Sequence, residues 1–178
     1  MSKKSRNVCE ETGEIAPLVR GPRNKKEKGE LAELAFLHKA ASLGFGVAKP
    51  YGDSECYDFV LDSGKRFWRV QVKSSYVASR RVYRAMAQRT NRQRYRAADI
   101  DFLVAYVVPQ DVWYVIPVKC FAASATMGFY PSGCRRNAGR FECYREAWYL
   151  MAPGAGLPRP GTLRRVRTIE IHRKHLVE

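Results

Sequence analysis

The pattern of apolar and polar positions predicts a helix over residues 25–43. Asn24 is a residue type typical of a helix N-cap, and Glu27 three positions later completes a capping-box pattern. Gly44 stands where a glycine commonly ends a helix. The positions that follow helical spacing inside this stretch are Leu31, Leu34, Ala35 and His38. We expect His38, on the apolar side, to be packed rather than catalytic.

A β-hairpin is predicted next. Tyr57–Leu61 is a short strand candidate, residues 62–65 form a turn signal, and Arg66–Ser74 alternates strictly between apolar and polar side chains. The alternation places Trp68, Val70 and Val72 on one face and Arg69, Gln71 and Lys73 on the other. We expect a further short strand at Phe45–Lys49.

The rest of the chain gives weaker signals. Residues 76–98 are rich in arginine and carry no apolar period. The later elements that we expect are strands at Phe102–Val108 and Val112–Pro117, a helix over about 118–126, a loop over 127–140, a strand or short helix at Glu142–Met151, a linker at Pro153–Gly161 and a last strand at Val166–His172.

The hairpin brings polar side chains together. With a two-residue turn at Ser63–Gly64, Asp58 lies opposite Arg69 and shares a face with Gln71 and Lys73. Gln71 is then the diagonal neighbour of Asp58, roughly 7–8 Å away at the backbone. A loop of three or five residues would break this parity.

Such a cluster suits phosphodiester hydrolysis. Asp58 offers a carboxylate and Gln71 an amide oxygen, and hard divalent cations prefer oxygen ligands. Lys73 offers a positive charge that would orient a nucleophile or stabilise charge developing on phosphate. The alternative interpretations are that Asp58 only solvates the end of a strand and that Lys73 is an exposed strand lysine.

The charge of the chain favours a polyanionic partner. Lysine and arginine number 32 against 17 acids, a formal net charge of +15. Residues 63–98 contain eleven of the cations and no acid, whereas a merely solvated face normally mixes signs. We predict phosphate contacts for Arg69, Arg80, Arg81, Arg84, Arg89, Arg92, Arg94 and Arg96, with Tyr76, Tyr83 and Tyr95 interleaved. A second, looser contact is expected at Arg135, Arg136 and Arg140.

Other features point to a cytoplasmic protein without a membrane partner. The first residues lack the apolar segment of a signal peptide, and no stretch approaches the ~20 apolar residues of a membrane span. The five cysteines are odd in number and not tightly spaced, so we expect free thiols. A zinc site from Cys134, Cys143, His172 and His175 matches no finger spacing and is disfavoured.

The spacing of Asp58, Gln71 and Lys73, preceded by Glu33 in the helix, resembles the PD-(D/E)XK nuclease superfamily. The similarity is greatest to the branch related to group I intron homing endonucleases, in which Gln replaces the usual acid before x-Lys. It extends over about residues 25–120, through Asp99–Phe102 and Trp113–Pro117, with a weaker similarity at Tyr144–Trp148. This sequence departs from the motif in having Tyr57 rather than proline before the aspartate.

The resemblance implies a restriction-endonuclease-like α/β core, a mixed central β-sheet flanked by helices, that cleaves double-stranded DNA with Mg²⁺, or with Mn²⁺ in its place. It implies catalytic roles for Glu33, Asp58, Gln71 and Lys73, with Asp58 and Gln71 on the metal, and Glu30 is the alternative to Glu33. We expect residues 1–23 to be a flexible basic arm and 24–178 a single nuclease domain. A homo-oligomer is compatible with cutting two strands. The rival functions are a structure-selective nuclease such as a junction resolvase and a binding module whose nuclease site has decayed.

Overall fold

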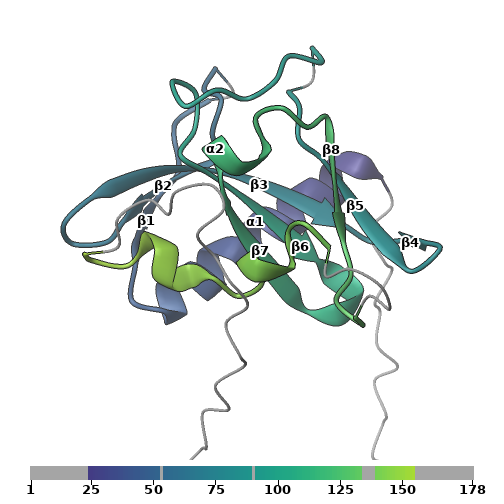
Figure 1. The fold of residues 1–178 in the computed structure, drawn as a ribbon. Helices are drawn as coiled ribbons and strands as arrows, with labels where there is room; N and C mark the ends of the chain where they lie inside the picture. Colours follow the sequence, from purple (N-terminus) through teal and green to yellow (C-terminus); the bar gives the residue numbers. More distant parts are fainter. Residues whose placement is uncertain (1–23, 53, 90, 134–138, 155–178) are drawn as a thin grey trace, which may run out of the picture.

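The computed structural model describes residues 24–52, 54–89, 91–133 and 139–154. Its helices and strands follow in the order α1 (Lys25–Ser42), β1 (Gly46–Ala48), β2 (Phe59–Asp62), β3 (Phe67–Ser75), β4 (Ala78–Ser79), β5 (Val82–Met86), β6 (Phe102–Val107), β7 (Val112–Pro117), α2 (Val118–Phe121) and β8 (Thr126–Phe129) (Figure 1). Short 3-10 helices lie at Val108–Gln110, Glu142–Tyr144 and Trp148–Met151, so the segment after residue 141 is helical rather than extended.

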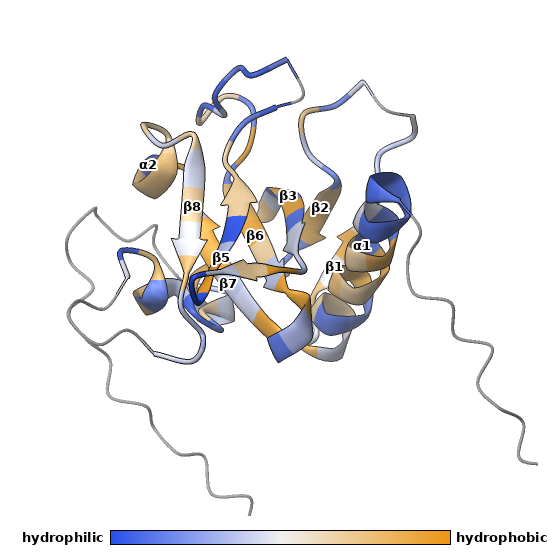
Figure 2. Ribbon diagram, turned by 90° about the vertical axis from the view of Figure 1, so that its right-hand side faces the viewer, coloured by the Kyte–Doolittle hydropathy of each residue, from blue (hydrophilic) through white to orange (hydrophobic). Residues whose placement is uncertain are grey.

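The central sheet has five strands in the order β1-β2-β3-β6-β7. β3 and β6 are parallel, and the other neighbours are antiparallel, so the sheet is mixed. β6 and β7 are buried almost throughout, as their unbroken apolar sequences predict. This mixed sheet with α1 packed against it confirms the expected restriction-endonuclease-like α/β core (Figure 2).

α1 begins as predicted but packs through a different face. The N-cap prediction is confirmed, because the Asn24 Oδ1 accepts a hydrogen bond of 2.9 Å from the Glu27 amide. The residues that α1 buries are Ala32, Phe36 and Ala40, whereas Leu31, Leu34 and His38 are exposed. The expectation that His38 is packed was therefore wrong. The Phe36 ring meets Phe59 at 5.0 Å between centroids, and the flanking alanines let the helix approach the sheet closely.

The β2–β3 hairpin has the predicted face but another register. Phe59 pairs with Val70 and Asp62 with Phe67, so four residues connect the strands instead of the predicted two. Side chains close this longer loop: the Gly64 amide donates to Asp62 Oδ1 at 2.7 Å, and the Ser63 hydroxyl donates to the Arg66 carbonyl at 2.9 Å. The observed register differs from the predicted one by two residues, so each side chain still lies on the predicted face of the sheet.

A second sheet, of order β4-β5-β8, was not predicted. Residues 76–98 contain the β4–β5 hairpin, whose only fully buried strand residue is Ala85, so no apolar period marks it. The helix expected over 118–126 ends at Phe121, and the loop expected over 127–140 begins as strand β8. Met127 and Phe129 alternate with Thr126 and Gly128, a period of two that the nearby Gly and Pro residues obscured.

Some expectations fall outside the described residues: the arm at 1–23, the strand at Val166–His172, most of the linker, and Cys9, Cys134, His172 and His175. Among the described residues Cys56, Cys120 and Cys143 are free thiols, as expected. In the same part of the chain, no helix is both long and apolar enough to cross a membrane.

Candidate active site

One cleft is lined by all four side chains that sequence reasoning proposed for catalysis. α1 contributes Glu33, the residue before β2 is Asp58, and β3 contributes Gln71 and Lys73. The cleft has a volume of about 410 Å³. Its remaining walls come from the segments on either side, and they include Lys49, Glu55, Tyr57, Arg89, Asn91 and Tyr95.

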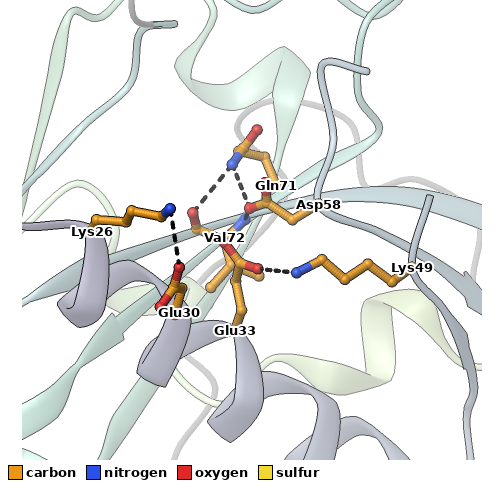
Figure 3. Close-up of polar contacts among 7 residues, drawn as sticks. All are labelled: Lys26, Glu30, Glu33, Lys49, Asp58, Gln71 and Val72. Carbon is orange, nitrogen blue, oxygen red and sulfur yellow. Dashed lines mark hydrogen bonds and ion pairs between the residues drawn. The ribbon is translucent and has the colours of Figure 1, made fainter. Parts of the chain in front are cut away.

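The Asp58 carboxylate is held in place by β3 (Figure 3). Its Oδ2 accepts a hydrogen bond of 2.7 Å from the Val72 amide and another from the Gln71 side-chain amide. The Asp58 amide in turn donates to the Val70 carbonyl at 2.9 Å. The observed register therefore puts Asp58 in direct contact with Gln71, closer than the diagonal relation that the two-residue turn predicted.

Electrostatics in the cleft favour a cation. Burial raises the pKa of Asp58 above its ordinary value, and the charge of Glu33 raises it further. The hydrogen bonds from Val72 and Gln71 and the charge of Lys73 lower the pKa of Asp58, but they do not cancel the effect of burial. A carboxylate in this position is stabilised by an additional positive charge.

Glu33 and Glu30 lie in different surroundings. Glu33 points from α1 toward the strands and forms an ion pair of 2.7 Å with Lys49 (Figure 3). Glu30 is exposed, pairs with Lys26 at 3.8 Å and does not line the cleft. Sequence reasoning missed Lys49, since nothing in the spacing of the motif marks a lysine just after β1.

Gln71 is almost fully buried, with 7 % of its surface exposed. Its Nε2 faces Asp58 and lies 3.3 Å from the Val72 carbonyl oxygen, so the amide oxygen is turned away from Asp58 (Figure 3). A half-turn of the amide would present Oε1 instead of Nε2 to an ion beside Asp58.

The donors in the cleft fit a hydrated Mg²⁺ ion. Within the described residues there is no group of three or more His, Cys, Asp or Glu side chains arranged to hold a metal. The cleft instead offers the carboxylates of Asp58 and Glu33 and the amide oxygen of Gln71. Mg²⁺ in proteins is commonly bound through one or two carboxylates while it keeps several waters, so this set suffices.

Three of the eight arginines proposed to contact nucleic acid have partners within the protein. Arg69 Nε lies 3.1 Å from Asp101, and its Nη2 donates to the Ala97 carbonyl at 2.9 Å. Arg94 donates to the Ala123 carbonyl at 2.6 Å, and Arg96 pairs with Asp99 at 3.4 Å. These three side chains brace the segment before β6. Arg140, from the second predicted contact, donates to the Cys120 carbonyl at 2.7 Å, and Arg135 and Arg136 lie outside the described residues.

The side chains of the other five arginines make no hydrogen bond or ion pair with the described residues. Arg89 is the member of the set that lines the cleft. Beside it, the Tyr95 ring is buried, and burial together with the charge of Asp58 raises the pKa of its hydroxyl. Tyr95 therefore forms a wall of the cleft and is not an exposed ring. The remaining members of the five are Arg80, Arg81, Arg84 and Arg92.

Comparison with known proteins agrees with this geometry. The family model described as PD-(D/E)XK endonuclease matches residues 23–148. The chain therefore belongs to the PD-(D/E)XK endonuclease family, which makes it a nuclease by class and confirms the resemblance seen in the sequence. Its structure is similar to that of a bacterial homing endonuclease, I-Ssp6803I, with 35% sequence identity and a TM-score of 0.64, over 72% of this chain and 91% of the other. Among curated proteins no sequence matches.

Proposed function

We propose that this protein is a Mg²⁺-dependent endonuclease that hydrolyses phosphodiester bonds in double-stranded DNA. The observation that carries the proposal is that Glu33, Asp58, Gln71 and Lys73 line one cleft in a chain of the PD-(D/E)XK endonuclease family. Mn²⁺ would serve in place of Mg²⁺, because it accepts the same oxygen donors.

Each side chain has a role that follows from its chemistry. Asp58 and Gln71 hold the ion through oxygen atoms, and Glu33 completes the site through a second ion or a water. When bound, Mg²⁺ polarises the scissile phosphate and lowers the pKa of its water. Lys73 orients the nucleophile and stabilises the charge that develops on the phosphate. Arg89, on the wall of the same cleft and with no side-chain hydrogen bond or ion pair among the described residues, binds a neighbouring phosphate.

The choice of duplex DNA as substrate rests on charge and on the structural neighbour. A net charge of +15 favours a polyanion. The similar solved structure is that of a homing endonuclease. An endonuclease that cuts both strands is compatible with assembly of two copies.

Asp58→Asn and Lys73→Ala test the proposal. Both should lower the rate of plasmid nicking by on the order of 10²-fold or more, because one removes a metal ligand and the other the transition-state cation. Nicking is measured with Mg²⁺, with Mn²⁺ and with a chelator, and circular dichroism checks that the variants fold.

Matched controls exist on the surface. Asp111→Asn removes an exposed carboxylate and Lys65→Ala an exposed lysine, both away from the cleft, and neither should change the rate. Nicking at the wild-type rate by Asp58→Asn or Lys73→Ala would refute the assignment of the active site. A wild-type protein that binds duplex but is inert with both metals would be a decayed binding module instead.

A further inference from the structure

The β4–β5 hairpin projects from the body of the protein. Both residues of β4, Ala78 and Ser79, are exposed, although one face of a strand in a packed sheet is normally covered. Val77, just before β4, has 77% of its surface exposed. Figure 1 shows β4 at the outer edge of the molecule, beyond the end of β3.

The tip of this hairpin is made of two arginines in an unfavourable backbone conformation. Ser79 pairs with Val82, so Arg80 and Arg81 are the two central residues of the turn. Their φ angles are 51° and 68°, the left-handed region that such a tight turn requires and that Asn and Gly adopt most readily. The sequence thus has long cations where the backbone favours Asn-Gly, and strained residues of this kind concentrate at functional sites.

The charges at the tip are available to a partner. Arg80, Arg81 and Arg84 are exposed, and their guanidinium groups have no hydrogen-bond or ion-pair partner among the described residues. Residues 63–98 contain no acid, so nothing within this segment offsets them. On β5, Arg84 lies opposite Gly128, which has no side chain to cover it. A two-stranded ribbon has the width that the major groove of duplex DNA admits, and guanidinium groups match phosphate.

From these observations we infer that the β4–β5 hairpin is a second DNA contact, separate from the cleft, that binds backbone phosphates flanking the cleavage site through Arg80 and Arg81. The inference rests on the proposed function for its partner. The chain limits how far away this contact lies. Nine residue steps separate Gln71 from Arg80, which at roughly 3.3 Å per residue span at most about 30 Å. With the length of an arginine side chain added, the contact falls within about one helical turn of the cut phosphate, ~34–36 Å.

The double variant R80N/R81G tests the contact without harming the turn. It removes both charges and installs the Asn-Gly pair that this turn favours, so the thermal midpoint should stay equal or rise. Each phosphate contact contributes about 0.9 to the slope of log affinity against log salt. Between 50 and 200 mM salt, the affinity of the wild type for a duplex should therefore fall about twelvefold more than that of the variant.

Binding is measured by fluorescence anisotropy on the full chain without divalent metal, so that cleavage plays no part. The control K65A/K119A removes two exposed lysines elsewhere and should keep the wild-type slope unless the charge effect is general. Equal slopes for the wild type and R80N/R81G overturn the inference, and so does an equal drop in the control. A wild-type protein that does not nick DNA would refute the proposed function. The difference in salt dependence between the wild type and R80N/R81G would still stand, because it is measured by binding.

Hydroxyl-radical footprinting on a duplex that the protein cuts tests how far the hairpin contact lies from the cut phosphate. The wild type should protect backbone sugars out to about one helical turn from the cut, and R80N/R81G should lose the outermost protection only. Protection lost next to the cut phosphate instead would overturn the placement of the hairpin as a flanking contact.

Discussion

At the scale of single residues, Gln71 acts on the charge of Asp58, although its effect is smaller than that of burial or of the Val72 amide. Its amide donates to Asp58, whose pKa burial already raises, so Gln71 stabilises the ionised form of that carboxylate. A glutamate at this position would place a second carboxylate beside Asp58 and raise the pKa of Asp58 further. The glutamine thus keeps Asp58 ready to bind a cation, at the cost of weaker attraction for that cation.

Substitution of Gln71 separates these effects. Gln71→Glu should keep Mg²⁺-dependent nicking, with half-maximal rate at lower Mg²⁺ and weaker DNA affinity, because the added charge attracts the ion and repels phosphate. Gln71→Ala should lose most of the activity, while Gln110→Ala, an exposed control outside the cleft, should not. The measurement is nicking rate against Mg²⁺ concentration on one duplex. A Gln71→Ala variant as active as the wild type would remove Gln71 from the site.

The residues of the cleft differ in how far the sequence could predict them. Asp58, Gln71 and Lys73 lie within one hairpin, where the alternation of side chains and the spacing of the motif bring them to one face. Lys49 meets Glu33 only because the segment after β1 returns to α1. The sequence assigned Arg69 to DNA because its partner, Asp101, is 32 positions away, directly before the neighbouring parallel strand β6.

At the scale of elements, α1 positions Glu33 by packing against the sheet through the face that carries Phe36, while its leucines lie on the exposed face. Phe36 lies against Phe59 and also near Trp113 and Trp148, with centroids 6.3 and 6.0 Å away. Sequence reasoning followed the larger apolar residues Leu31 and Leu34, which are 45% and 63% exposed. The pattern of the helix is ambiguous because alanines, which carry little hydrophobic signal, occupy two of its three buried positions.

The packing of α1 gives a stability prediction. Phe36→Ala should destabilise the protein by about 3–5 kcal/mol, because it empties an aromatic cluster between helix and sheet. Leu34→Ala, two residues away on the exposed side, should change the free energy of unfolding by no more than about 0.5 kcal/mol. Urea unfolding with unchanged m-values measures both. A larger loss for Leu34→Ala than for Phe36→Ala would mean that α1 packs through its leucines.

The strands differ in how well the sequence pattern predicts them. β6 and β7 were predicted nearly to the residue, because continuous apolar runs mark strands buried on both faces. β4 and β5 have almost no buried apolar residues, and β8 carries a glycine, so the second sheet left little hydrophobic signal. The register of the β2–β3 hairpin depended on hydrogen bonds within its loop, which residue types alone did not predict.

At the scale of the whole molecule, the positive charge is divided between different tasks. Arg69, Arg94 and Arg96 brace the fold, Arg89 lines the cleft, and the arginines of the β4–β5 hairpin project from the second sheet. A count of cations could predict a polyanionic partner but not this division, because the division depends on acids and carbonyls brought together by folding. The acids Glu33 and Asp58, by contrast, line the cleft, where the proposed function uses them to bind the metal ion.

Metal binding to the folded protein should be visible as stability, independently of catalysis. An ion that binds only the native state at 100 times its Kd stabilises by about 2.7 kcal/mol. For a chain of this size, that corresponds to a rise in the thermal midpoint of roughly 5–10 °C. Mg²⁺ should therefore raise the melting temperature of the wild type, and Asp58→Asn should abolish most of the rise.

Two matched variants of α1 extend this test to the helix carboxylate. Glu33→Gln should reduce the rise, because Glu33 lines the cleft and its charge acts on Asp58. Glu30→Gln removes the same charge three residues earlier, from an exposed side chain paired with Lys26, and should leave the rise unchanged. Differential scanning fluorimetry across a Mg²⁺ titration compares the four proteins at fixed ionic strength. If Glu30→Gln weakened the shift and Glu33→Gln did not, the helix carboxylate of the site would be Glu30. An undiminished rise in Asp58→Asn would mean that the ion binds outside the cleft altogether.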